Sequence, residues 1–356
     1  MRAIVLHAHG GPDVLAPAEL PDPIPGPGHV TVDVHAVALN RLDLWVRGGL
    51  PGLTLPLPHV LGSDIAGVVT EVGDGVDRSW LGRDVVVNPG LSCGTCESCL
   101  AGWDNLCPRY RILGETAPGG YCERLAVPQQ NLLEKPPGLG MIEAAAVPLT
   151  FLTAWQMLVT RAHVAPGQVV LIHAVGSGVG VAGLQIARLH GARVIALASS
   201  DAKLAAARAL GAEATIRSDA PDWDRQVRGL PFVGKRGVDV VFEHTGAATW
   251  AASLKLCRRG GVVVLCGATS GHEAVTDLRQ IFFRQLQVLG STMGAKASLF
   301  QILGLVARGQ LRPVVDRTFP LGQAADAHRY LDRREQFGKV VLTVAGPAPA
   351  VTSPPA

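Results

Sequence analysis

The sequence has few charged and few aromatic residues, and it has no long apolar run. Charged side chains make up 17% of the 356 residues and aromatic side chains 5%, and the formal net charge is only +3. Lys and Arg look scattered along the chain, whereas a nucleic-acid-binding surface needs a concentrated basic face. No apolar run is long enough to cross a bilayer. These features predict a folded protein with neither a nucleic-acid nor a membrane partner.

The beginning of the chain also lacks a signal-peptide core. The stretch MRAIVLHAHGG is typical of a strand. We therefore expect a cytoplasmic, reducing environment, in which clustered cysteines indicate metal ligands before disulfides. A chain of 356 residues is too long for one typical core, so we expect two domains.

The character of the chain changes near residue 143. Before it, short alternating stretches separated by Pro- and Gly-rich turns are typical of β structure. After it, buried apolar strands alternate with helical stretches, which indicates a doubly wound parallel sheet. We predict a mainly-β domain over 1–150, a nucleotide-binding domain over 151–295, a return to the first domain over 296–346 and a disordered Pro/Ala-rich tail over 347–356.

Four of the seven cysteines lie in the segment CGTCESCLAGWDNLC. Their spacing, C-x2-C-x2-C-x7-C, lets the sulfurs turn toward one centre. Four thiolates close a tetrahedral zinc site and leave no open position for a substrate. We therefore predict one structural zinc ion per chain, with unligated or redox-active cysteines as the alternative. The predicted ligands are Cys93, Cys96, Cys99 and Cys107.

A glycine-rich turn joins a buried strand to a helix in VVLIHAVGSGVGVAGLQIA. Glycines let the backbone approach a pyrophosphate, and the helix N-terminus supplies N–H groups and a positive dipole end. The turn predicts a dinucleotide site, the alternative being a tight turn without a ligand. Its register is open, led by Gly176 or by Gly178. We expect backbone contacts from Ser177, Gly178 and Val179, and close helix–strand packing at Gly180.

The next strand ends at Ala198 and is followed by Ser199 and Ser200. A site that prefers NAD(H) places an acidic residue there to accept bonds from the ribose 2′-hydroxyl. Asp201 is expected instead to cap the following helix. Small hydroxyls and the nearby cation of Lys203 suit a 2′-phosphate, so we predict NADP(H), with NAD(H) possible. The alternative is that Lys203 is a solvated helix residue.

Together these features resemble the medium-chain dehydrogenase/reductase superfamily, in its zinc alcohol dehydrogenase and quinone oxidoreductase group. The resemblance extends to about residue 345. It is carried by GGPDVL, LGSDIAGVVTEVGDGV, the cysteine segment with DNLC, LTAW and HAVGSGVG. It implies an α/β protein with a Rossmann doubly wound parallel sheet and a mainly-β GroES-like catalytic domain that carries a zinc lobe.

In the zinc alcohol dehydrogenases a second zinc ion polarises the alcohol oxygen. The sequence departs from the family at all three ligand positions, which are Asn40, Ser63 and about Leu149 here. An amide, a hydroxyl and an aliphatic side chain cannot hold zinc tightly. An asparagine at the position of Asn40 resembles the quinone oxidoreductase branch, although that branch usually lacks the cysteine lobe. A different catalytic metal set stays open as an alternative, from His59, Asp43 and Asp64.

The resemblance also implies the other site residues. Thr153 is expected to pack on the nicotinamide, and Asn40 to bind the substrate carbonyl or the nicotinamide ribose. Asp43 is expected to position Arg41 or the loop, with no role in proton transfer. The expected cofactor-binding residues further include Thr245, Cys266 and Gly267, with the backbone over 266–268 holding the carboxamide.

We therefore predict an NAD(P)H-dependent oxidoreductase that transfers hydride to a quinone or an activated enone or carbonyl without catalytic zinc. Such an acceptor delocalises the incoming charge through its own carbonyl group. Two alternatives are a zinc-dependent alcohol or aldehyde dehydrogenase with non-standard ligands and a non-catalytic NADPH-binding protein. The segment LQVLGSTMGA matches the place where relatives pair their sheets, which implies a homodimer or a tetramer. The expected pocket walls are Trp45, Leu50, Leu57 and Phe283.

Overall fold

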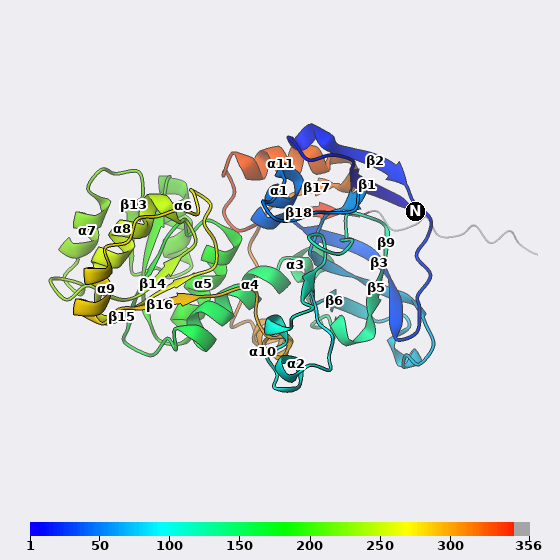
Figure 1. The fold of residues 1–356 in the computed structure, drawn as a ribbon, viewed down its shortest axis with the longest axis horizontal. Helices are drawn as coiled ribbons and strands as arrows, with labels where there is room; N and C mark the ends of the chain where they lie inside the picture. Colours follow the sequence, from blue (N-terminus) through cyan, green and yellow to red (C-terminus); the bar gives the residue numbers. More distant parts are fainter. Residues whose placement is uncertain (345–356) are drawn as a thin grey trace, which may run out of the picture.

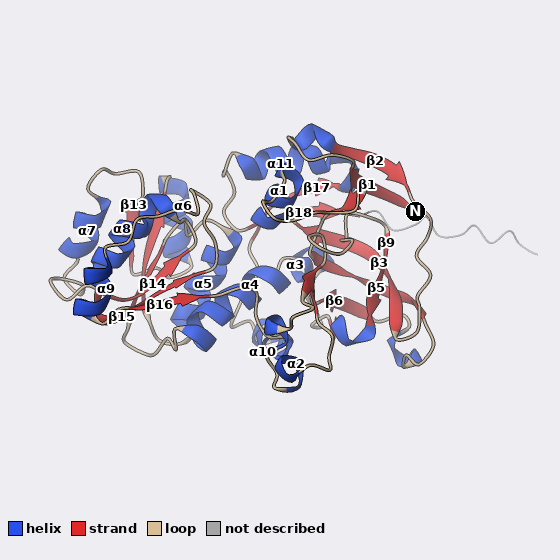
Figure 2. Ribbon diagram, in the orientation of Figure 1, coloured by secondary structure: helices blue, strands red, loops and turns tan. Residues whose placement is uncertain are grey.

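The computed structural model of the protein describes residues 1–344 and shows two bodies side by side (Figure 1). The tail over 347–356, predicted to be disordered, lies outside the described residues. One body is the parallel-sheet domain, and the other is mainly β (Figure 2). No helix within residues 1–344 is both long and apolar enough to span a membrane.

The parallel-sheet domain has six strands in the order β13-β12-β11-β14-β15-β16. Its central strands are continuous apolar runs and are buried, because helices cover the sheet on both faces. The strand order reverses between β11 and β14, and in such sheets ligands bind beyond the carboxyl ends of the strands at this point. The strands are β11 (Val169–Ile172), β12 (Arg193–Ala198), β13 (Ala214–Arg217), β14 (Val238–Glu243), β15 (Cys257–Leu265) and β16 (Gln287–Gly290).

Five helices belong to this domain and connect its parallel strands, as right-handed crossovers require. The first of them, α5, follows the glycine-rich turn and packs on β11 and β12. Its start therefore lies at the carboxyl edge of the sheet, beside the crevice. The helices are α5 (Gly178–Leu189), α6 (Asp201–Ala209), α7 (Trp223–Gly229), α8 (Ala247–Leu256) and α9 (Leu278–Arg284).

The mainly-β domain is built on a seven-stranded sheet in the order β10-β6-β5-β3-β18-β17, with β9 also paired to β3. Strand β18 comes from the end of the chain and lies between β3 and β17, so the chain returns to its first domain. The strands are β3 (His29–Ala38), β5 (Asp64–Val72), β6 (Asp84–Val87), β9 (Arg124–Pro128), β10 (Leu132–Glu134), β17 (Val315–Pro320) and β18 (Lys339–Thr343).

Smaller elements surround this sheet. A three-stranded sheet has the order β2-β1-β4, and β7 pairs with β8 beside the cysteine segment. The elements are β1 (Arg2–Leu6), β2 (Leu15–Glu19), β4 (His59–Val60), β7 (Gly90–Leu91), β8 (Arg111–Ile112), α1 (Arg41–Gly48), α2 (Glu97–Leu100) and α11 (Ala324–Asp332). Short 3-10 helices cover Pro12–Val14, Arg78–Trp80, Asp104–Leu106, Gln129–Asn131 and Leu321–Gln323.

Helices α3 (Met141–Ala145), α4 (Pro148–Trp155) and α10 (Lys296–Ala307) join the two domains. Pro148 begins α4, where its missing N–H costs nothing, and the helix continues as π-helix over Gln156–Arg161. Because α4 packs on both α5 and α10, one apolar core runs from β3 through α4 to β11. The domain limits near 150 and 295 therefore stay predictions.

Candidate functional site

The corner between β3 and α1 holds Asn40 and Asp43. Asn40 is the N-cap residue of α1. The Asp43 carboxylate accepts hydrogen bonds from the backbone N–H of Asn40 at 2.6 Å and of Gly62 at 3.0 Å. Burial raises the pKa of Asp43 to about 7, while these two N–H donors and the charge of Lys339 act against the rise. Asp43 thus fastens the Asn40 corner to the loop before β5.

A buried ammonium group lies beside this corner. Lys339, the first residue of β18, places Nζ 2.6 Å from Oδ1 of Asn40 and 2.7 Å from Oδ2 of Asp64. Asn40 donates from Nδ2 to the same Asp64 oxygen at 2.9 Å, and the Leu149 N–H donates to the other at 2.7 Å. The fold therefore brings Asn40 and Leu149 together around Asp64, with a cation at the centre.

Lys339, which is 275 residues from Asp64 along the chain, was not among the predicted site residues. Its signal was a lysine at the start of an apolar strand, where a charged side chain is buried only with a partner. Ser63, the remaining ligand position of the family, is fully buried, and its hydroxyl has no partner among the described residues.

The glycine-rich turn lies against the same cluster. A Cβ at Gly178 would meet Cδ of Lys339 at 2.8 Å, and the Gly338 N–H donates to the Gly176 carbonyl at 2.9 Å. Ser177 caps α5 by accepting from the Gly180 N–H at 3.0 Å. A Cβ at Gly180 would lie 2.8 Å from the Ala174 carbonyl oxygen, so this glycine is closely packed.

These positions suit the pyrophosphate of a dinucleotide. The N–H groups of the first helical turn have no acceptor within the helix, and Gly178 and Val179 occupy that turn. Bulkier residues at Gly178 would push into the Lys339 side chain. The turn thus presents donors at the carboxyl edge of the parallel sheet, next to the start of β18.

The other predicted cofactor residues lie on α4 and just beyond the carboxyl ends of β14 and β15. Thr153 on α4 is buried, and its Oγ1 has no partner among the described residues, as a hydroxyl awaiting a ligand would. Trp45 of α1 lies 3.6 Å from the position that a Cβ at Gly267 would take. The backbone N–H groups of Thr245 and Cys266 are used by Glu243. This leaves Gly267 as the residue that faces the opposite domain.

In dinucleotide-binding folds of this type the ribose binds beyond the strand that follows the glycine-rich turn and its helix, which is β12 here. Ser200, not Asp201, caps α6 by accepting from the Lys203 N–H, so the expected cap is corrected by one residue. The Ser200 hydroxyl is better placed than the Asp201 carboxylate to accept from the N–H groups of the first turn, because the N-cap residue stands just outside that turn. Lys203 is only partly exposed and donates from Nζ to the Arg334 carbonyl. Burial lowers its pKa, so it is not a freely solvated helix residue.

A second cation lies near this edge. Arg217 ends β13 and forms ion pairs with Asp201 at 3.3 Å and Asp219 at 2.6 Å. Neither Arg217 nor Arg334 was among the predicted site residues. The signal for Arg217 would have been parallel pairing of β13 with β12, which brings the end of one strand beside the end of the next.

The cysteine segment forms a compact sulfur cluster. The Sγ atoms of all four predicted ligands lie within 4.8 Å of one another, and none is in a disulfide. Two of the sulfur–sulfur distances are 3.5 Å and 3.9 Å. Four sulfurs at about 2.3 Å from a tetrahedral zinc ion would be about 3.8 Å apart. The geometry fits zinc closely.

Hydrogen bonds fasten the sulfur cluster and its lobe. Backbone N–H groups of Cys93, Cys96 and Arg109 donate to sulfur at 3.4 to 3.5 Å. Asp104 accepts from the Lys296 N–H at 2.8 Å, and Asn105 donates to the Thr292 carbonyl at 3.2 Å. The lobe thus anchors the segment that leaves the parallel-sheet domain. Among residues 1–344, no second group of His, Cys, Asp or Glu converges as a metal site would.

The predicted pocket walls do not all meet. Trp45 stands at the crevice, as described above. Phe283 lies on α9, is 65% exposed and accepts a hydrogen bond at its carbonyl from Arg259, at the other edge of the sheet. The prediction that Phe283 lines the substrate pocket of its own chain is therefore wrong. The error arose because the apolar character of a residue indicates that it tends to be buried but does not indicate where in the fold it lies. Leu57 is 42% exposed, and Leu50 is partly exposed.

Comparisons with known proteins agree with this architecture. The family model for the alcohol dehydrogenase GroES-like domain matches residues 26–137, and that for zinc-binding dehydrogenase matches residues 178–308. Crotonyl-CoA reductase of Streptomyces avermitilis is 33% identical over 92% of this chain and 82% of its own length.

Two solved structures superpose closely on the chain. A crystal structure of an NAD-dependent alcohol dehydrogenase is 54% identical, covers 97% of this chain and all of its own, and has a TM-score of 0.93. The crotonyl-CoA carboxylase/reductase AntE in complex with NADP is 27% identical, covers 98% of this chain and 95% of its own, and has a TM-score of 0.89. With its two domains, sulfur cluster and glycine-rich turn, the chain belongs to the medium-chain dehydrogenase/reductase superfamily of oxidoreductases.

Proposed function

We propose that the protein is an NADP(H)-dependent reductase of quinones or α,β-unsaturated carbonyl compounds that works without a catalytic zinc ion. The observation that carries the proposal is the position of Lys339. Its ammonium group lies between Asn40 and Asp64, beside the positions where the family's zinc alcohol dehydrogenases hold their catalytic metal. A divalent cation only a few ångströms from a buried ammonium would be strongly repelled.

The donors of the crevice suit an electron-poor acceptor. When bound, NADPH supplies the hydride, and the substrate's own carbonyl spreads the resulting charge. Lys339 uses two of its three ammonium N–H groups on Asn40 and Asp64. The third N–H and the Ser63 hydroxyl are the donors offered to a substrate oxygen, while the Thr153 hydroxyl is offered to the nicotinamide.

Asn40 serves this site mainly as a positioning residue. Its amide oxygen is bound by Lys339 and its nitrogen by Asp64, so little of it is left for a substrate. Asp43 and Asp64 both accept hydrogen bonds from neighbouring groups. Because both carboxylates are buried and bound by these neighbouring groups, we propose that solvent supplies the proton.

The cofactor preference rests on the edge beyond β12. One solved relative is described as NAD-dependent and another contains NADP. In this chain Ser199 and Ser200 follow β12 without an acidic residue at the strand end, and Lys203 adds positive charge. Cations and hydroxyls favour a 2′-phosphate over a free 2′-hydroxyl. We therefore propose NADP(H), with one structural zinc ion in the cysteine lobe.

A second candidate is an alcohol dehydrogenase, favoured by the 54% identical relative of that description.

Metal content and substrate range distinguish the zinc-independent reductase from the alcohol dehydrogenase. The purified chain is analysed for zinc and assayed with quinones and enones plus NADPH, and with alcohols plus NAD⁺ or NADP⁺, before and after a mild chelator. Near one zinc ion per chain and chelator-resistant reduction would support the proposal. Near two zinc ions and chelator-sensitive alcohol oxidation would favour the second candidate.

We also propose that the protein forms a homodimer through β16. This strand is at the edge of the parallel sheet, and an unpaired edge is a template for pairing with another chain. Nearby apolar side chains are exposed, with Val288 at 38% and Phe282 at 58%. Light scattering coupled to size-exclusion chromatography measures the mass, and a monomer at micromolar concentration would contradict this assembly.

A further inference from the structure

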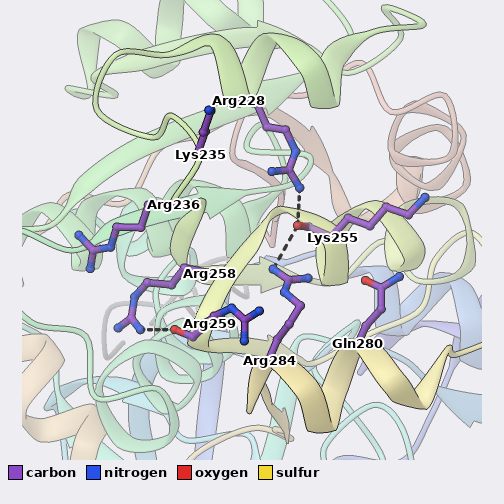
Figure 3. Close-up of a pocket in the computed structure, with 8 residues that line it drawn as sticks. All are labelled: Arg228, Lys235, Arg236, Lys255, Arg258, Arg259, Gln280 and Arg284. Carbon is purple, nitrogen blue, oxygen red and sulfur yellow. Dashed lines mark hydrogen bonds between the residues drawn. The ribbon is translucent and has the colours of Figure 1, made fainter.

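A pocket of about 670 Å³ at the amino-terminal edge of the parallel sheet is lined almost wholly by basic side chains (Figure 3). Seven of its eight lining residues are Arg or Lys. The expectation that the basic residues are scattered is therefore wrong for this region. Residues far apart between positions 228 and 284 come together because helix ends and strand starts meet at one edge of a parallel sheet.

A large bulge in β15 builds one wall of the pocket. Val238 of β14 pairs with Cys257, and Val240 pairs with Val262, so two steps along one strand oppose five along the other. The extra residues turn away from the sheet, with Gly260 at a φ of 66°. This places Arg258 and Arg259 next to each other on the pocket wall.

Some of the basic side chains also serve the fold. Asp239 accepts from Arg236 at 2.9 Å and from Arg258 at 2.5 Å. Arg228 and Arg284 both donate to the Lys255 carbonyl at the end of α8, as the dashed lines in Figure 3 show. Cations at this end of a helix are stabilised by its dipole. These contacts explain four of the seven basic residues, and each uses only part of the guanidinium donors.

The other three basic residues make few contacts that stabilise the fold. The ammonium groups of Lys235 and Lys255 have no hydrogen-bond or ion-pair partner within residues 1–344. Arg259 accepts a hydrogen bond from Arg258 at its carbonyl, and its guanidinium donates one N–H to the Phe283 carbonyl. Asp239 is the one carboxylate that pairs with the pocket's lining residues in the described part of the chain. So many like charges in a concave site repel each other unless an anion joins them.

We propose that this pocket binds a small polyanion through its phosphate groups, in the class of inorganic polyphosphates and nucleoside triphosphates. Guanidinium forks match phosphate oxygens in pairs. No aromatic side chain lines the pocket, so nothing stacks on a base, and phosphate alone is recognised. Its concave shape suits a compact anion better than a nucleic-acid duplex.

This pocket is separate from the cofactor crevice. Arg258 lies near the start of β15 and the crevice lies beyond its end at Leu265. Along the regular partner strand β14 this distance corresponds to the five steps from Val238 to Glu243, so at about 3.3 Å per residue the two edges are about 17 Å apart. An anion in the basic pocket therefore does not compete with the pyrophosphate of a dinucleotide.

Calorimetric titration of the full-length protein with inorganic tripolyphosphate, with and without saturating NADPH, tests the proposal. The double variant Lys235→Gln/Lys255→Gln removes two charges that have no folding partner, so it should fold normally. The control variant Arg78→Gln/Arg208→Gln removes the same charge from exposed side chains outside the pocket. Circular dichroism and the melting temperature check that both variants are folded.

We expect the pocket variant to bind tripolyphosphate at least tenfold more weakly, and the control variant to bind as the wild type does. ATP should bind about as tightly as tripolyphosphate, and NADPH should leave both affinities unchanged. Equal weakening in the two variants, displacement by NADPH, or binding of ATP alone would overturn the proposal. Tighter binding of duplex DNA than of tripolyphosphate at equal phosphate concentration would also overturn it, in favour of a nucleic-acid surface.

Discussion

The ammonium nitrogen of Lys339 lies 2.7 Å from a carboxylate oxygen of Asp64, and both side chains are almost completely buried. The aliphatic part of Lys339 packs against Gly178 of the glycine-rich turn. Asp64 in turn binds the backbone of α4 at Leu149. One ion pair therefore connects the seven-stranded sheet, the joining helix α4 and the glycine-rich turn, so its loss should destabilise both domains.

Replacing Lys339 by Met should lower the free energy of unfolding by about 3–5 kcal/mol, because Asp64 is left as an uncompensated buried charge. Turnover should fall as well, since the crevice loses its cation. Urea unfolding followed by circular dichroism measures the first effect, and NADPH oxidation with an enone measures the second.

The double variant Lys339→Met/Asp64→Asn is the control for that substitution. It removes both charges and should recover much of the lost stability but not the activity. If the single variant were as stable as the wild type, the ion pair between Lys339 and Asp64 would not stabilise the fold. If it were also fully active, the assignment of Lys339 to the site would be wrong.

The raised pKa of Asp43 predicts a pH-dependent stability. Burial raises this pKa to about 7 in the folded protein, whereas the unfolded value is about 4. Between these values the folded state holds a proton that the unfolded state has released, so stability falls as the pH rises from about 4 to about 7. Above that range the contribution is constant.

Comparison with the variant Asp43→Asn isolates this carboxyl group. The difference in unfolding free energy between wild type and variant, measured by urea titration at several pH values, should decrease as the pH rises through this window. A difference that is flat with pH, or that grows, would show that Asp43 keeps an ordinary pKa in the folded protein.

Replacing Lys203 by Ala should weaken NADPH binding about tenfold or more, because a charge-assisted hydrogen bond to the 2′-phosphate is lost. NADH binding should change little. Fluorescence titration with each cofactor gives both dissociation constants. Arg208→Ala removes a cation from an exposed side chain near the end of the same helix and serves as the control. Equal losses for NADPH and NADH would refute a role in 2′-phosphate binding.

Local patterns predicted much of the fold. The apolar runs gave the parallel sheet because buried parallel strands need no polar face, and the cysteine spacing predicted the sulfur cluster because its four residues are close in sequence. Glycine placement predicted the tight turn between β11 and α5 for the same reason. In each case the interacting residues are neighbours along the chain.

Long-range contacts were not predictable in this way. Lys339 meets Asp64 only because β18 inserts beside β3, and nothing near either residue indicates that pairing. The basic pocket likewise depends on strand order and on a bulge. Phe283 was misplaced because its position depends on the side of the sheet that α9 covers. These features follow from topology, which a single sequence shows only indirectly.

Replacing Cys96 by Ser should lower the zinc content well below one ion per chain and reduce the free energy of unfolding by about 3 kcal/mol, since loss of a structural metal is among the larger destabilising changes. Cys122→Ser is the matched control, because this buried thiol donates to the Arg124 carbonyl outside the cluster, as a hydroxyl also could. Elemental analysis measures the zinc content, and urea unfolding measures the free energy of unfolding.

NADPH binding and turnover of the folded fraction should persist, because four thiolates leave no ligand position for a substrate. Complete loss of turnover in a folded, cofactor-binding Cys96→Ser protein would show that the cluster takes part in the chemistry.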